Sequence, residues 1–219
     1  MIPTPKIPPS IMKAKPNLLI YLIRHGSTPL NEAGAFRGMS QVSLSEQGEK
    51  EAKSLSTFMK KFPLDFLFTS PLPRAKETAS IILENQSIDK FEIDERLKSV
   101  NYGEWEGQKQ SDLQIKFPEQ MIQYRKSIET LTFPGGESLV DVQTRLLDFL
   151  DEISQKFDQK SIGIVTHQIC TRVLLSSILA NDLSMYWKLG QNPCCVNIIK
   201  CFKDQYVVDL MNYTPYKMN

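Results

Sequence analysis

Residues 18–26 read LLIYLIRHG, a continuous apolar run that ends on the polar triplet Arg-His-Gly. Its apolar residues do not alternate with polar ones, which is typical of a parallel strand buried on both faces of its sheet. Two later runs have the same character. We therefore predict three buried parallel strands, at Leu18–Ile23, Leu64–Phe68 and Ile162–Val165.

Each predicted strand is followed by a stretch with helical periodicity. Helices are expected after Ser45, from Pro73 and after Ser138, because serine suits the N-cap of a helix and proline its first turn. Two late runs, at 195–202 and 206–211, predict strands that close the sheet. The alternation of strands and helices predicts an α/β fold, a three-layer α/β/α sandwich with a mostly parallel central sheet.

Two further segments complete the predicted organisation. Residues 1–16 are rich in proline, which predicts a flexible leader, and residues 17–219 contain no linker or repeat, which predicts a single domain. The segment 104–134 fits no strand. It predicts a mostly helical insertion, broken at Pro118, of the kind that often forms a lid or a wall of a substrate site.

Composition excludes several classes of protein. The chain has 219 residues and a formal net charge of +1, which gives no electrostatic reason to expect nucleic acid or a membrane surface as a partner. No apolar run approaches the roughly 20 residues that span a bilayer, and no secretory signal is recognisable. We interpret the 4 cysteines as buried, reduced thiols and expect a cytoplasmic protein.

The chain contains 2 histidines, His25 and His167, and each stands one or two residues past the C-terminal end of a predicted buried strand. Open α/β sheets bind ligands at these strand ends. Arg24 precedes His25, and Arg74 follows the predicted strand at 64–68. Guanidinium groups match the oxygens of a tetrahedral phosphate, and an imidazole among positive charges has a lowered pKa and remains a neutral nucleophile. The pattern therefore predicts a catalytic phosphate site.

The stretch from Leu22 to Asn31 resembles the signature of the histidine phosphatase superfamily, in its phosphoglycerate-mutase-like branch. Later blocks resemble this family in the same order, at residues 36–48, 70–79, 102–107, 135–138 and 166–172. The resemblance covers nearly the whole chain after the leader.

The resemblance implies that His25 attacks phosphorus and becomes a phosphohistidine, while Arg24, Arg74 and His167 bind the phosphoryl oxygens. It implies no metal and no cofactor, because arginines and histidines supply the positive field, and it implies a small phosphate ester as the substrate. The residues expected around that substrate are Thr28, Asn31, Arg37, Gly38, Tyr102 and Gln168, the last standing where the family often has glycine.

One position departs from the family pattern. Ser99 stands where the family has a glutamate that protonates the leaving group, and a hydroxyl is far too weak an acid for that role. General acid catalysis contributes about 10²–10⁴-fold. This departure leaves three alternatives: another carboxylate substitutes, the enzyme is slow on alkyl phosphates, or the protein binds phosphate without turnover. The nearest downstream carboxylate, Glu104, is the first candidate for the catalytic acid, followed by Glu95 and Glu106.

These observations predict a metal-independent phosphomonoesterase that hydrolyses small phosphorylated metabolites through a phosphohistidine on His25. A catalytically weak phosphate-binding or regulatory domain is an alternative, which Ser99 supports. A phosphoglycerate mutase is a further alternative, but the short, arginine-poor stretch between Gly107 and Gly135 is less typical of mutases.

Overall fold

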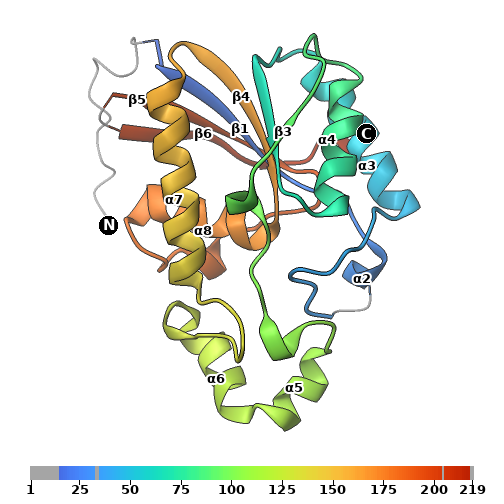
Figure 1. Cartoon of the computed structure of the whole chain (residues 1–219), viewed down its shortest axis with the longest axis vertical. Helices are drawn as coiled ribbons and strands as arrows, with labels where there is room; N and C mark the ends of the chain where they lie inside the picture. The colour runs from blue at the N-terminus through green and yellow to red at the C-terminus, as the bar shows by residue number, and fades with distance from the viewer. Residues whose placement is uncertain (1–14, 33–34, 204, 218–219) are drawn as a thin grey trace.

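A computed structural model describes residues 15–32, 35–203 and 205–217. Its core is a six-stranded sheet with the strand order β3-β2-β4-β1-β5-β6 (Figure 1). Neighbours from β3 to β1 pair in parallel, whereas β5 pairs antiparallel with both β1 and β6. The strands are β1 (Leu18–Arg24), β2 (Phe66–Thr69), β3 (Glu92–Ile93), β4 (Lys160–Thr166), β5 (Val196–Phe202) and β6 (Gln205–Tyr213). The predicted α/β fold with a mostly parallel sheet is confirmed.

The central strand β1 is buried on both faces because a helical layer covers each one. Leu18, Ile20 and Leu22 belong to the larger apolar core, whereas Tyr21 and Ile23 belong to a second core on the opposite face. This division follows from the alternation of side chains along a strand. The larger core includes α7 (Leu139–Lys156) and α8 (Gln168–Ala180), and the second includes α3 (Glu46–Met59) and α4 (Pro73–Leu83). In Figure 1, α7 and α8 lie on one side of the view and α3 and α4 on the other.

The helices begin where the sequence predicts. The Ser45 side chain accepts a hydrogen bond from the backbone of Gly48 and caps α3, and Pro73 occupies the first turn of α4. At the start of α7, Ser138 and Asp141 form a capping box in which each side chain binds the other's backbone N–H. These local devices position the turns that lead out of the sheet.

The predicted insertion contains two helices, α5 (Gln110–Lys116) and α6 (Pro118–Lys126), which lie beyond one end of the sheet in Figure 1. The break falls at Pro118, because proline lacks the N–H that a continuous helix would need there. The ring of Trp105 is fully buried and anchors the insertion through edge contacts with Phe36 and Phe133.

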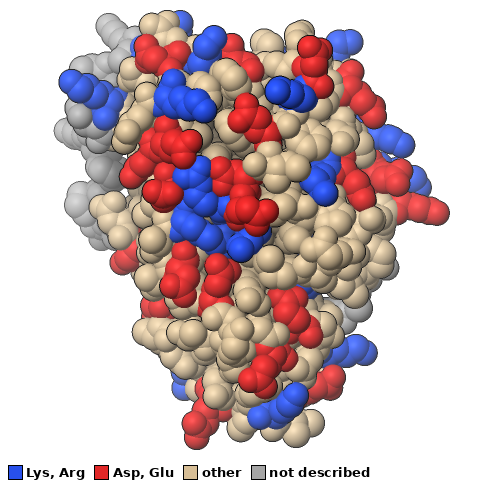
Figure 2. All heavy atoms as spheres, in the orientation of Figure 1, with Lys and Arg blue, Asp and Glu red and all other residues tan. Residues whose placement is uncertain are grey.

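The sequence does not predict strand β3. Its residues, Glu92 and Ile93, are exposed at the edge of the sheet, so no apolar run marks them. The proline-rich leader predicted at 1–16 lies almost entirely outside the described residues, and the single domain at 17–219 remains a prediction. Among the described helices, none is long and apolar enough to cross a bilayer. Basic and acidic side chains are interspersed on the face shown in Figure 2.

Candidate active site

The C-terminal ends of β1, β2 and β4 bring together the predicted catalytic residues other than Glu104. Arg24 ends β1 opposite Thr166 of β4, and the next residues along the two strands are His25 and His167. The two imidazole rings lie 5.1 Å apart between centroids. Arg74 reaches the same place from the first turn of α4.

These side chains line a cavity of about 400 Å³. Its wall is made of Arg24, His25, Ala35, Phe36, Arg37, Gly38, Arg74, Ser99, Tyr102, Gln110, Tyr124, His167, Gln168 and Ile169.

His25 is held with one ring nitrogen available for attack. Nδ1 lies 2.7 Å from the carbonyl oxygen of Gly26, which can only accept, so Nδ1 carries the proton. Nε2 then has the lone pair, and it accepts a hydrogen bond from Nε of Arg74 at 3.2 Å. Burial, followed by the charges of Arg74 and Arg24, holds the pKa of His25 well below 6.5. His25 is therefore a neutral imidazole whose lone pair faces a cation.

Arg74 is fixed by the loop that precedes α3. Its Nη1 donates to the carbonyl of Ser40 and its Nη2 to the carbonyl of Gly38, both at 2.8 Å. The side chain is 1% exposed. Burial and the nearby charge of Arg37 lower the pKa of Arg74 to about 10, so it remains cationic at neutral pH.

Arg24 is buried against a network of neutral polar groups. Its Nη1 donates to the carbonyl of Gln191, whose side-chain amide is paired with Asn197. Nε of Arg24 is buried and has no hydrogen-bond partner among the described residues. Burial and the charge of Arg37 lower its pKa to about 10. An unused donor on a buried cation beside His25 suits an incoming anion.

His167 begins α8 and has one unpaired nitrogen. Its Nε2 lies 2.7 Å from the hydroxyl oxygen of Ser70, whereas Nδ1 is buried without a partner among the described residues. Burial, then the charge of Arg74, holds the pKa of His167 well below 6.5. Ser70 directly follows β2, and this place at the end of a strand is the sequence signal that could have identified it as a partner of His167.

Of the residues expected around the substrate, Arg37, Gly38, Tyr102 and Gln168 line the cavity. Thr28 is fully buried and does not form part of the wall. The side chain of Asn31 lies outside the described part of the chain. The predicted insertion contributes Gln110 and Tyr124 to the wall, although no local motif marks these two residues individually. Sequence reasoning did not single out Ala35, Phe36 and Ile169 as wall residues.

The structure does not bring Glu104 into the cavity. Glu104 is exposed on the 3-10 turn Gly103–Trp105, because that turn directs Trp105 into the core and the backbone N–H of Glu104 to Pro134. Glu95 is also exposed. Glu106 is half-buried behind the wall, where its Oε1 accepts backbone N–H groups of Met39 and Tyr102. Among the described residues, no Asp or Glu lines the cavity.

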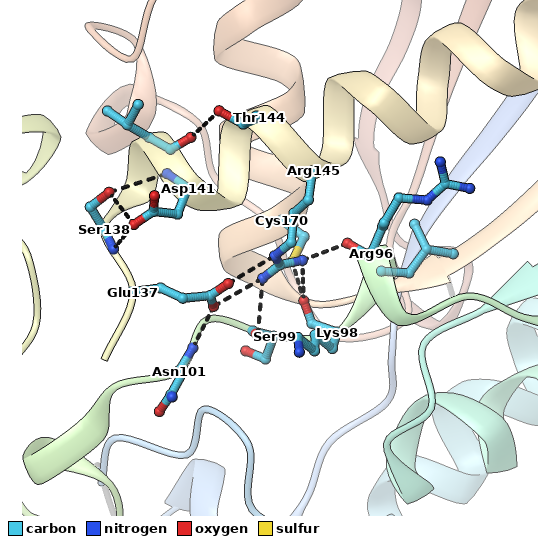
Figure 3. Close-up of polar contacts among 12 residues, drawn as sticks. Arg96, Lys98, Ser99, Asn101, Glu137, Ser138, Asp141, Thr144, Arg145 and Cys170 are labelled. Atoms are coloured by element: carbon cyan, nitrogen blue, oxygen red, sulfur yellow. Dashed lines mark hydrogen bonds and ion pairs between the residues drawn. The ribbon is translucent and has the colours of Figure 1, made fainter. Parts of the chain in front are cut away.

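The loop that carries Ser99 is held from behind by one arginine of α7 (Figure 3). Arg145 donates to the carbonyls of Arg96, Lys98 and Ser99, and its Nε pairs with Oε1 of Glu137 at 3.1 Å. Oε2 of Glu137 accepts a hydrogen bond from the backbone N–H of Asn101, in the same loop, at 2.8 Å. The segment Gly135–Ser138 thus acts structurally, by fixing the loop that forms one wall of the site.

Comparisons with known proteins agree with this geometry. A family model described as histidine phosphatase superfamily (branch 1) matches residues 20–214. Phosphoserine phosphatase 1 of Hydrogenobacter thermophilus is 29% identical over 195 residues, which cover 89% of this chain and 92% of that protein. A 2,3-bisphosphoglycerate-dependent phosphoglycerate mutase of Cytophaga hutchinsonii is 33% identical over 162 residues, covering 72% of this chain and 75% of that one.

A solved structure of a protein described as a putative alpha-ribazole-5'-P phosphatase from Escherichia coli superposes with a TM-score of 0.81 at 23% identity, covering 90% of this chain and 97% of that one. That likeness concerns the fold, whereas the family model spans the strand ends that carry His25 and His167. The predicted resemblance and the predicted class of enzyme, a phosphatase, are confirmed. The chain belongs to branch 1 of the histidine phosphatase superfamily.

Proposed function

We propose that this protein is a metal-independent phosphomonoesterase that hydrolyses small phosphate esters through a phosphohistidine on His25. The observation that carries the proposal is the state of His25: its Nδ1–H is tied to Gly26, and its Nε2 lone pair faces Arg74. A neutral imidazole with an oriented lone pair beside guanidinium groups is an activated nucleophile for phosphorus.

The first step would transfer the phosphoryl group to His25. Nε2 forms a bond to phosphorus while the ester P–O bond breaks and its electron pair leaves with the oxygen. Arg24 and Arg74 would neutralise the charge spread over the phosphoryl oxygens, and the unpaired Nδ1 of His167 is available to them as well. Water then attacks phosphorus and keeps one proton as the new P–OH, while its other proton passes to a phosphoryl oxygen. The P–Nε2 bond breaks, Nε2 regains its lone pair, and phosphate leaves.

The rate of hydrolysis should depend on how stable the leaving oxygen is as an anion. No carboxylate lines the cavity among the described residues, and burial holds the pKa of Tyr102 well above its ordinary value. Burial also raises the pKa of Tyr124 to about 12, so neither tyrosine of the described wall is a strong acid for a departing alkoxide. Esters whose leaving oxygen is stable as an anion would react fastest, and a domain that binds phosphate but turns over slowly is the second candidate function.

The test is capture of the intermediate. Wild-type protein is mixed briefly with an aryl phosphate, quenched in alkali, where phosphohistidine survives, and analysed by mass spectrometry of its peptides. We expect one phosphate on His25 and complete loss of turnover in His25→Ala. Gln114→Ala, at an exposed position on α5, is the matched control. Label on serine, aspartate or cysteine would overturn the proposal, and return of the label to a phosphorylated acceptor rather than to water would favour a mutase.

A screen of the purified protein against phosphorylated metabolites then identifies which ester it hydrolyses. The assay is run with and without a chelator, since the proposal requires turnover that survives metal removal. Binding of inorganic phosphate without turnover of any ester would favour the phosphate-binding domain.

A further inference from the structure

The peptide group between Gly26 and Ser27 is held at both ends. Its carbonyl oxygen accepts from Nδ1 of His25 at 2.7 Å, and its N–H donates to Oε2 of Glu51 at 2.9 Å. The described chain contains no cis peptide bond, and a trans peptide points its C=O and N–H in opposite directions. The carboxylate, the peptide and the imidazole therefore form one continuous chain of hydrogen bonds.

Glu51 comes close to this peptide because two glycines allow it. A Cβ on Gly48 would lie 2.0 Å from the carbonyl oxygen of Ser27, and a Cβ on Gly26 would lie 2.7 Å from the carbonyl oxygen of Gly48. The first turn of α3 thus packs directly on the loop that follows His25. Glu51 lies one turn beyond Gly48 on the same face of α3, so its carboxylate faces the Ser27 N–H.

Glu51 is buried, with 5% of its surface exposed, and its carboxylate makes no ion pair among the described side chains. Its Oε1 also accepts from the Ser27 hydroxyl at 3.0 Å and from Gln47 at 3.4 Å. The titratable neighbours that sense its charge are Cys194 and Tyr216, and burial raises the pKa of both, so they are neutral. A buried carboxylate without a cationic partner is costly to maintain. Its Oε2 accepts from the peptide that holds the nucleophile.

We propose that Glu51 is a positioning residue which, through the Gly26–Ser27 peptide, fixes the Nδ1–H tautomer of His25 and stabilises the charge of its phosphorylated ring. This rests on the proposed function. When Nε2 bonds phosphorus, Nδ1 keeps its proton and the ring becomes cationic. The carboxylate polarises the peptide so that its oxygen holds Nδ1–H more strongly, and hydrogen bonds in such a chain reinforce one another in a low-dielectric interior.

The test is Glu51→Gln, which keeps an oxygen acceptor for Ser27 and removes the charge. We expect the single-turnover rate of His25 phosphorylation by an aryl phosphate to fall about tenfold, equivalent to roughly 1.4 kcal/mol. The inhibition constant of inorganic phosphate should stay nearly unchanged, because Glu51 does not touch the ligand. Glu51→Asp should restore part of the rate. Lys50→Ala, at an exposed position next to Glu51 on α3, is the control and should phosphorylate at the wild-type rate.

A folded Glu51→Gln variant with a wild-type rate would overturn the inference and leave the proposed function intact, whereas activity in His25→Ala would overturn the proposed function itself. Should Glu51→Gln not fold, nitrogen NMR of the wild type gives the answer. We expect Nδ1 of His25 to carry the proton, and both this proton and the Ser27 amide proton to resonate at low field, as protons in strong hydrogen bonds do. An Nε2–H tautomer, or a Ser27 amide proton at an ordinary chemical shift, would overturn it.

Discussion

Replacing Arg145 with methionine tests how the Ser99 loop is held against the cavity. The side chains of Arg145 and Glu137 are 14% and 22% exposed, so both charges are largely removed from water. Removing one member of a buried ion pair costs about 3–5 kcal/mol, because the other charge is left uncompensated. Glu137 keeps one backbone N–H, so we expect a loss near the lower limit, about 3 kcal/mol of unfolding free energy.

The assay is urea unfolding of wild type, Arg145→Met, Glu137→Gln and the double variant. Glu137→Gln leaves the three carbonyl contacts of Arg145 in place and should cost about 1–2 kcal/mol. The double variant should cost less than the two single variants combined, with a coupling energy of about 1–2 kcal/mol. The KM for an aryl phosphate should rise in Arg145→Met, because Ser99 and Tyr102 no longer lie at fixed positions in the wall.

Arg125→Met is the matched control. Arg125 is an exposed arginine of α6, and its loss should change the unfolding free energy by no more than about 0.5 kcal/mol. A cost below about 1 kcal/mol for Arg145→Met, with additive single variants and an unchanged KM, would refute the view that this ion pair fixes the loop.

Further predictions concern pH, substrate charge and the leaving group. Both histidines are held neutral, with pKa values well below 6.5. The unfolded state therefore binds more protons as the pH drops from 7 toward 5, and the unfolding free energy should fall over that range. The unfolding free energy of a His25→Asn/His167→Gln variant should depend less on pH, and an equal slope would contradict the assignment of neutral histidines. Arg37 lines the cavity and makes no ion pair or side-chain hydrogen bond among the described residues. Arg37→Gln should therefore raise the KM about tenfold for esters with a second anionic group, and much less for phenyl phosphate. Equal increases in KM for both kinds of ester would argue against a second anion site. Alkyl phosphates should react about 10²–10⁴-fold more slowly than aryl phosphates, and Ser99→Glu should accelerate alkyl esters selectively; rapid alkyl turnover in the wild type would show that an acid outside the cavity wall takes part.

Much of this protein follows from local sequence. A continuous apolar run predicts a buried parallel strand, and the carboxyl ends of neighbouring parallel strands meet at one edge of a sheet. Arg24, His25 and His167 lie one or two residues past such runs, so their convergence could be predicted without a structure. The helix starts were equally readable, because caps and N-terminal prolines act within one turn.

Tertiary packing decided the rest. Whether a carboxylate near the site faces the cavity depends on which side of a short turn is buried, and burial of Trp105 leaves Glu104 in solvent. Arg145 reaches the Ser99 loop, and Glu51 the peptide behind His25, across separations that no local pattern encodes. Strand and helix periodicities report which face of an element is buried, but contacts between distant loops arise only once the layers are packed.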